Sequence, residues 1–246
     1  MEKRDLFKLT KSENNEDLIE EYILSFKKDN PSIDVQTITD DDIDPIYFSY
    51  DKKIRILILG THVTINSLNA RLQYTNVRNN KFWTILESVF NLNGLTSLTK
   101  KYEQCFKSVK NENPINYNKL YDIKKMIVHC LKKTKFDIAI SDIIGCCRCL
   151  SGRDRDIIPG TEKKSRDLDK LINDADLIVF NGRNTETILN DLIKRKRFIF
   201  NFSYKEKSIA VISTSGVASI KVEQKIKCWK CMINSKLKEL NVAEQI

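Results

Sequence analysis

The run IRILIL at residues 54–59, directly followed by Gly60, decides the fold class of this chain. A short, wholly apolar run that stops at a glycine is typical of a parallel strand buried on both faces. Similar runs occupy residues 136–140, 177–180 and 209–212, and residues 198–202 are expected to form an edge strand.

The segments between these runs show the spacing of amphipathic helices, at residues 80–91, 119–133, 185–196 and 221–240. Strands that alternate with helices indicate a parallel sheet covered on both faces. The sequence therefore predicts an α/β fold, a three-layer α/β/α sandwich around a central parallel four-stranded sheet. Sites in such sheets lie beyond the carboxyl ends of the strands, here near Gly60, Ser141, Asn181 and Ser213.

The 246 residues suit one domain with an elaboration. Residues 1–44 are predicted to be an acidic, partly helical N-terminal extension, with one amphipathic helix over residues 16–28. Residues 45–246 are predicted to form the main domain, which would carry any active site.

Charge is unevenly distributed along the chain. The formal net charge is +9, yet residues 1–50 hold 13 acids against 6 bases, and the remainder holds 36 bases against 20 acids. A basic body favours a polyanionic partner, nucleic acid first. A lysine-rich surface that results from AT-rich coding bias explains the same numbers, so charge alone leaves both interpretations open.

Composition also bears on location and cofactors. No apolar run approaches twenty residues and no charged-then-apolar leader is present, so we expect a soluble protein that is not exported, in the cytoplasm, nucleoid or nucleus. The seven cysteines are expected to be reduced thiols. The cluster Cys146, Cys147 and Cys149 and the pair Cys228 and Cys231 permit a metal interpretation, but we expect neither metal nor cofactor.

The stretch after the first predicted strand reads Gly60-Thr61-His62-Val63-Thr64-Ile65-Asn66-Ser67-Leu68, then Tyr74, then Asn80-Lys81-Phe82-Trp83. It resembles the first motif of the mismatch-specific and hypoxanthine-type branches of the uracil-DNA glycosylase superfamily. There a strand ends in Gly-Thr or Gly-Ser, a Ser-Leu follows, and an aromatic residue precedes an Asn-x-Phe-Trp that opens a helix.

Three further stretches follow in the order of that family. Asp142, with Cys147, Asp154 and Ile157 after it, is similar to a Trp-Asp…Cys…Asp-x-x-Ile segment. Phe180-Asn181-Gly182 matches a Phe-Asn-Gly motif, and Ser213-Thr214-Ser215, with Trp229 further on, resembles the closing Ser-Thr-Ser-Pro loop and its helix. The resemblance covers about residues 45–232.

The chain departs from the family pattern at three places. Val63-Thr64 replaces a Pro-Gly, Gly216 replaces the last proline, and His62 stands where several branches have a water-activating Asn or Asp. The hypoxanthine branch places its essential Asn in Asn-x-Phe-Trp, which corresponds to Asn80 here.

The resemblance implies that His62 and Asn80 are catalytic. Imidazole titrates near neutral pH, so His62 could orient or deprotonate a water molecule, while the amide of Asn80 could hold that water or the base. The alternatives are a loop histidine bonded to a carbonyl, and an N-cap for the helix that starts at Lys81.

The resemblance also implies two sets of binding residues. Tyr74 would stack on a flipped base and Asp142 would accept hydrogen bonds from its edge, and the full base-binding set is Gly60, Thr61, Tyr74, Asp142 and Asn181. The DNA-binding set is Ser67, Ser213, Thr214 and Ser215, through hydroxyls and backbone amides. The alternatives are a half-buried aromatic at Tyr74, a loop-capping carboxylate at Asp142, a tight turn at Asn181-Gly182 and ordinary turn hydroxyls; Phe82 and Trp83 are expected in the core.

These residues together predict a monofunctional DNA glycosylase that acts on double-stranded DNA, or else on single strands, as a monomer, and leaves an abasic site. Hypoxanthine and modified cytosines rank above uracil as the excised base, in repair or in attack on modified foreign DNA. The rival is a catalytically inactive DNA-binding scaffold on the same fold. A Rossmann-like nucleotide enzyme is excluded because no G-x-G-x-x-G or Walker loop follows any strand.

Overall fold

The computed structural model describes residues 16–31, 35–39, 43, 45–75, 80–111, 117–150, 156–215, 220–243 and 245–246. Three sequence features lie outside these residues: Asp154, Gly216 and most of the acidic segment 40–44. Among the described residues, no helix is both long and apolar enough to cross a membrane.

A six-stranded, mostly parallel sheet forms the centre, in the order β1-β3-β2-β5-β6, with β4 paired to β3. The strands are β1 (Gln36–Ile38), β2 (Arg55–His62), β3 (Asp137–Cys149), β4 (Lys163–Lys164), β5 (Leu177–Asn181) and β6 (Ser208–Val211). The four strands β3, β2, β5 and β6 are mutually parallel, as predicted, whereas β1 and β4 add antiparallel pairings to β3.

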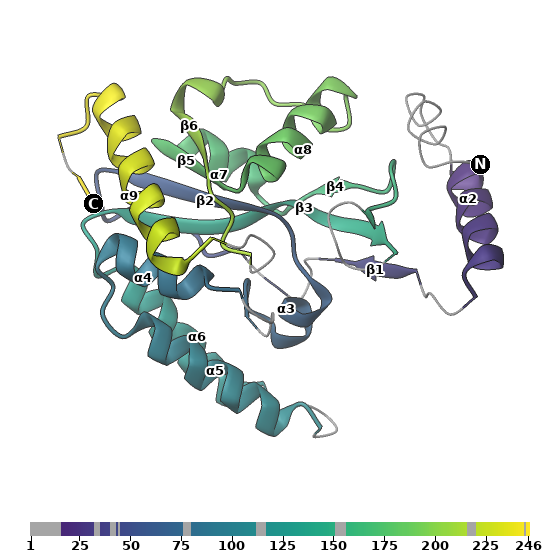
Figure 1. The fold of residues 1–246 in the computed structure, drawn as a ribbon, viewed down its shortest axis with the longest axis horizontal. Helices are drawn as coiled ribbons and strands as arrows, with labels where there is room; N and C mark the ends of the chain where they lie inside the picture. Colours follow the sequence, from purple (N-terminus) through teal and green to yellow (C-terminus); the bar gives the residue numbers. More distant parts are fainter. Residues whose placement is uncertain are drawn as a thin grey trace.

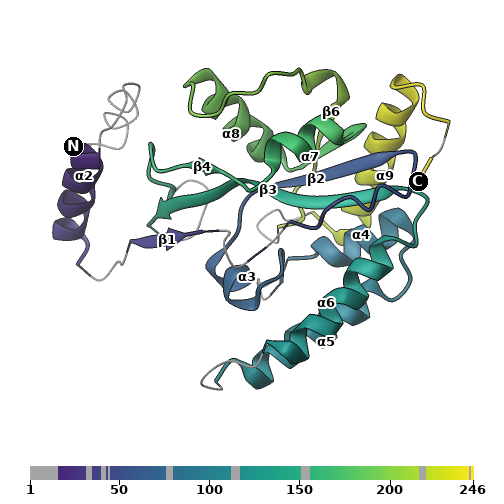
Figure 2. The same cartoon turned by 180° about the vertical axis from the view of Figure 1, so that it is seen from behind.

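Helices cover both faces of the sheet (Figures 1 and 2). One face carries α4 (Phe82–Phe90), α5 (Leu95–Val109), α6 (Asn118–Leu131) and α9 (Val222–Glu239), and the other carries α7 (Leu168–Asp174) and α8 (Arg183–Lys194). Side chains of a strand point alternately to the two faces. Accordingly, Ile56 and Ile58 belong to the core under the first group of helices, and Leu57 and Leu59 to the core under the second.

Two strands run further than the sequence predicts. β2 continues through Gly60 and Thr61 to His62, and β3 continues past Asp142 to Cys149. The two extensions pair with each other, since Gly60 is opposite Asp142 and His62 is opposite Ile144 across the two strands. Gly60 does not end the strand. Residues 60–62 and 141–149, which were expected in loops, instead belong to the paired strands β2 and β3.

The predicted edge strand at residues 198–202 is wrong. This segment contains bends and no strand, and the edge of the sheet is β6. Its apolar residues are used in packing: Phe198 is buried in the core under α7 and α8, and Phe200 packs against Phe202 and Tyr204. An apolar run can thus belong to a loop that packs over the core as well as to a strand.

The helices predicted from apolar spacing are present, with their ends moved by one or two residues. Within the described residues, three further α-helices were not predicted, namely α3 (Ile65–Ala70), α5 and α7. α5 shows the spacing of a buried helical face, with Tyr102, Phe106 and Val109 all in the core.

The N-terminal segment adds two elements at one end of the molecule, α2 (Glu16–Asp29) and β1 (Figure 1). Ile19, Tyr22 and Ile23 of α2 pack against Ile158, and Glu20 forms an ion pair with Arg148 of β3. Because β1 also pairs with β3, this segment contacts the main sheet; a domain boundary at residue 44 stays a prediction.

Candidate functional site

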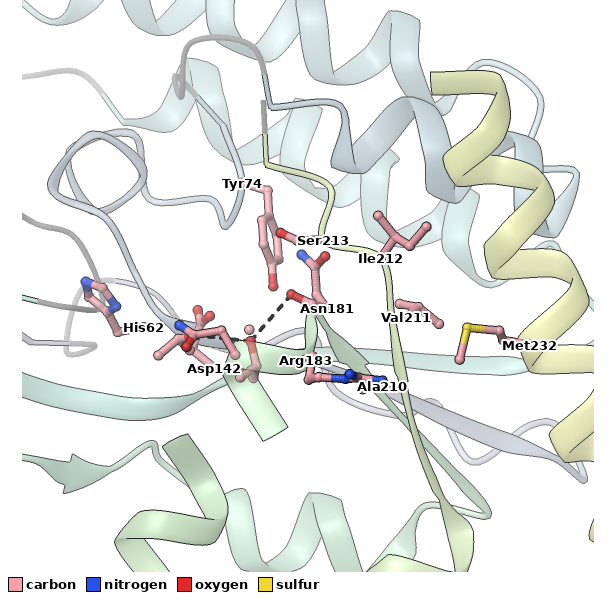
Figure 3. Close-up of a pocket in the computed structure, with 15 residues that line it drawn as sticks. His62, Tyr74, Asp142, Asn181, Arg183, Ala210, Val211, Ile212, Ser213 and Met232 are labelled. Carbon is pink, nitrogen blue, oxygen red and sulfur yellow. Dashed lines mark hydrogen bonds between the residues drawn. The ribbon is translucent and has the colours of Figure 1, made fainter. Parts of the chain in front are cut away.

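A pocket opens where the parallel strands end, with a volume of about 500 Å³ (Figure 3). β2, β3, β5, β6 and the residues directly after β6 all contribute to its wall, as expected for a site at the carboxyl edge of a parallel sheet. The lining residues are Gly60, Thr61, His62, Tyr74, Asp142, Asn181, Gly182, Arg183, Asn184, Thr185, Ala210, Val211, Ile212, Ser213 and Met232.

Tyr74 and Asp142 converge above Gly60. A Cβ atom built on Gly60 would overlap both Asp142 Oδ1 and Tyr74 Oη, so only glycine leaves room for these two groups. Asp142 is 5% exposed and belongs to β3, directly opposite Gly60 in the ladder. The close approach combines an aromatic ring and a carboxylate at the floor of the pocket.

Tyr74 is held from behind by an aromatic stack. Its ring lies parallel to that of Phe82, with centroids 3.8 Å apart and an interplanar angle of 14°. Its backbone has a φ of 59°, in the left-handed region that costs free energy for a non-glycine residue. The surrounding turn must therefore stabilise this conformation.

Several side chains fix that turn, residues 70–75. Tyr102 donates to Ala70 O at 2.6 Å, Trp83 Nε1 donates to Gln73 O at 3.2 Å, and Ser67 Oγ donates to Thr75 O at 2.9 Å. Ser67 is buried and absent from the pocket lining, so the structure gives this predicted DNA-binding residue a supporting position.

Asn181 forms a reciprocal pair with Thr214. The amide Nδ2 donates to Thr214 Oγ1 at 3.0 Å, and the backbone N–H of Thr214 donates to Asn181 Oδ1 at 2.9 Å. Thr214 O accepts from the backbone N–H of Lys81 at 3.3 Å, which brings the start of α4 to the same place. The predicted base-binding Asn181 therefore lines the pocket while its amide holds the 213–215 loop.

The three residues of the 213–215 loop lie in different environments. Ser213 lines the pocket, whereas Thr214 is fully buried behind it. Ser213 Oγ accepts from the backbone N–H of Ser215, and Ser215 O accepts from Lys225 Nζ at 2.7 Å. Lys225 is buried, and this burial lowers the pKa of its ammonium group.

The two predicted catalytic residues differ in position. His62 is 7% exposed, lines the pocket at the end of β2, and lies well apart from Tyr74 and Asn181 (Figure 3). Asn80 is not among the lining residues; its Oδ1 accepts the backbone N–H of Phe82 at 2.9 Å. The Asn80 side chain thus accepts from the first N–H of α4, although the N-cap residue is Lys81 and not Asn80 as the structural alternative had it.

Sequence reasoning missed the wall formed by α8. Thr185 Oγ1 lies 3.0 Å from Thr61 Oγ1, and Arg183 is the first residue of the helix. Gly182 has a φ of 112° and approaches Ser213 closely, so it lets α8 start directly behind β5. The Asn-Gly pair followed by helical spacing was the available signal, since the N-terminus of such a helix faces the carboxyl edge of the sheet.

The remaining wall of the pocket is apolar, and it was also not predicted from the sequence. Val211, Ile212 and Met232 line the pocket on the side of α9, where Figure 3 shows them beyond Arg183 and away from His62. The pocket is therefore polar at one end and apolar at the other. Within the described part of the chain, no three His, Cys, Asp or Glu side chains gather into a group that could hold a metal ion, and the seven cysteines are free thiols.

No protein-family model matches the chain, and no curated protein matches it. Among solved structures, the chain is similar to a solution NMR structure from Methanosarcina acetivorans described as "a putative Uracil DNA glycosylase". The match covers 82% of this chain and 97% of the other, with 16% sequence identity and a TM-score of 0.44.

Proposed function

We propose that this protein is a DNA glycosylase that hydrolyses the N-glycosidic bond of a damaged or modified base. The observation that carries the proposal is the convergence of Tyr74 and Asp142 above Gly60 on the pocket floor. A ring to stack on and a carboxylate to read an edge are the two parts that recognition of a flipped base needs. The basic charge of the chain beyond residue 50 supports a DNA substrate.

Each remaining part of the reaction has a candidate in the same pocket. His62 is the proposed residue that orients or deprotonates the attacking water, because Asn80 Oδ1 is engaged at the start of α4. Ser213 and the N-terminus of α8, with Arg183, are proposed to bind a DNA phosphate, since backbone N–H groups and cations at a helix start attract anions. Among the lining residues that the structure describes there is no lysine that could form a Schiff base, which supports hydrolysis to an abasic site.

An abasic-site assay tests the proposal. Duplex oligonucleotides that carry hypoxanthine, uracil or 5-substituted cytosine are incubated with the protein, and strand breakage at abasic sites is measured after alkali. His62→Ala is expected to lower the cleavage rate by about 10²-fold, as expected for a lost general base. Asp191→Asn, on the exposed face of α8, is the control and is expected to cleave at the wild-type rate.

A catalytically inactive DNA-binding scaffold is the second candidate. The observation that favours it is the hydrogen bond that engages Asn80 Oδ1 with the backbone N–H of Phe82, together with Val63-Thr64 in place of the Pro-Gly of the resembled family. Duplex binding without cleavage of any base in the panel would establish the scaffold function and overturn the enzymatic one.

A further inference from the structure

A second hollow, larger than the pocket, lies between the end of α3 and the exposed side of α6. Its volume is about 710 Å³. We call it the α6 groove and define it by six of its lining residues, Arg71, Tyr117, Tyr121, Lys124, Lys125 and Lys132. No aspartate or glutamate is among the residues that line it, so among the described residues its charged lining is entirely basic.

Aromatic rings and cations are interleaved along this groove. The guanidinium carbon of Arg71 lies 3.7 Å from the centroid of the Tyr117 ring, and Lys125 Nζ lies 4.2 Å from that of Tyr121. Both distances fall within the range of cation–π attraction. Each tyrosine is thereby positioned in a strongly positive environment.

Tyr121 is unusually exposed for an aromatic residue, at 58%. Met126, one and a half turns along the same helix, is also exposed, at 49%. Met126 lines an adjoining hollow of about 280 Å³ that shares Lys125 and His129 with the α6 groove and ends at Lys133. The basic, partly apolar surface therefore continues along α6 towards its C-terminal end.

We propose that the α6 groove binds a single strand of nucleic acid. Cations that track a phosphodiester backbone, combined with exposed aromatic rings for stacking, are the two features by which proteins bind single strands. A duplex would present phosphates to the lysines but would keep its bases stacked and away from Tyr121, which favours a single strand. No base-excision step enters this proposal, since the groove lies outside the pocket.

Position in the fold adds an independent argument. Arg71 and Tyr74 belong to the same fixed turn, with Arg71 in the groove and Tyr74 in the pocket. The two hollows are thus lined by residues only three positions apart in the sequence. The groove is therefore placed to hold the strand that flanks the pocket.

Fluorescence anisotropy with labelled oligothymidylate tests the proposal, and labelled oligouridylate distinguishes a preference for DNA from one for RNA. Lys124→Ala combined with Lys125→Ala should flatten the slope of log affinity against log salt by about 1.4, since each phosphate contact on a single strand contributes about 0.7. Tyr121→Ala should weaken binding about tenfold through lost stacking, whereas Tyr121→Phe should bind as the wild type does.

The charge-matched control is Lys53→Ala combined with Lys194→Ala, two exposed lysines that precede β2 and end α8. It should leave affinity and salt slope unchanged. The proposal is overturned if the wild type does not bind either oligonucleotide, if the control weakens binding as much as the groove variants, or if the groove variants bind normally. Oligothymidylate contains no base that the pocket is proposed to excise. A negative binding result therefore says nothing about base excision, and a negative excision assay does not contradict binding of a strand in the groove.

Discussion

Asn181 and Thr214 exchange two hydrogen bonds, one in each direction, across the gap between β5 and the loop that follows β6. Both residues are buried. A buried polar group that loses its partner costs about 1–3 kcal/mol, so the pair fixes the loop only while both members are present.

Thr214→Val removes the hydroxyl acceptor while keeping the shape of the side chain. We expect it to lower the free energy of unfolding by about 1–3 kcal/mol, because Asn181 Nδ2 is left without its acceptor. Denaturant unfolding of Thr214→Val, Asn181→Ala and the double variant gives the coupling energy. Additive single effects would show that the reciprocal pair contributes no stabilisation of its own.

Gly60→Ala should disable the pocket without unfolding the protein. The added methyl group overlaps Asp142 Oδ1 and Tyr74 Oη, so both must move from the pocket floor. We expect a loss of base excision of about 10²-fold or more, as for a misplaced catalytic group. The measurement is initial cleavage rate on the preferred duplex.

Gly94→Ala is the matched control for that experiment. Gly94 has a φ of 88° and open space around it, so alanine there is strained but touches nothing. It should lower the free energy of unfolding by about 1 kcal/mol and leave cleavage unchanged. Equal cleavage by the two glycine variants would contradict the proposed pocket floor.

Asp142→Asn should change which base is preferred. An ionised carboxylate only accepts hydrogen bonds, and the carbonyls that flank N3–H in uracil would face it unfavourably. An amide both donates and accepts, so the variant should shift initial cleavage rates from hypoxanthine or modified cytosine towards uracil. Uracil as the best substrate of the unaltered protein would contradict this ranking without excluding glycosylase activity.

Glu87 links stability to pH. Although burial alone would raise the pKa of this carboxyl, hydrogen bonds from Thr96 and Gly94 lower it below its ordinary value of 4.5. Its Oε2 accepts from the backbone N–H of Thr96 at 2.6 Å and its Oε1 from that of Gly94 at 3.1 Å, which caps the start of α5. A carboxyl with a lowered pKa in the folded state contributes stability above pH 4.5 and loses it as pH falls through the folded value.

Glu87→Gln should therefore lower the unfolding free energy at neutral pH by about 1–2 kcal/mol and reduce its dependence on acid pH. Thermal unfolding of both proteins at neutral and acid pH measures the difference. Parallel stability–pH curves for the two proteins would show that Glu87 does not carry the effect.

The parallel core of the sheet could be predicted because each of its strands is a short apolar run followed by a polar or glycine residue. The ends of the strands could not be predicted. The extension of β2 to His62 depends on pairing with β3, and the paired residues are far apart in the sequence. Residues 198–202 show the opposite case, in which an apolar run was predicted to be a strand but forms none. Its apolar side chains instead pack in the core on the side of α7 and α8.

The site was predictable to a similar extent. Gly60, Thr61, His62, Tyr74, Asp142, Asn181 and Ser213 do line one pocket. Met232 was not foreseen, because a residue on a helix surface gives no local sign of which cavity it faces. Arg183 was missed although the Asn-Gly pair directly before it marks the start of α8 at the edge of the sheet. Asn80 and Ser67 have hydroxyl or amide groups suited to a ligand, but the backbone groups beside them are the partners that the fold supplies.

The turn at residues 70–75 connects the pocket with the α6 groove, because Tyr74 lines the first and Arg71 lines the second. Three separate elements donate hydrogen bonds to its carbonyl groups, so a ligand that moves the backbone at Arg71 would disturb the hydrogen bonds that also hold Tyr74 in place. Any factor by which a strand in the groove changes the affinity of the pocket then applies equally in the opposite direction. Trp83 Nε1 donates to Gln73 O, which lies between Arg71 and Tyr74 in the turn, so Trp83 is the residue at which to test for such a coupling.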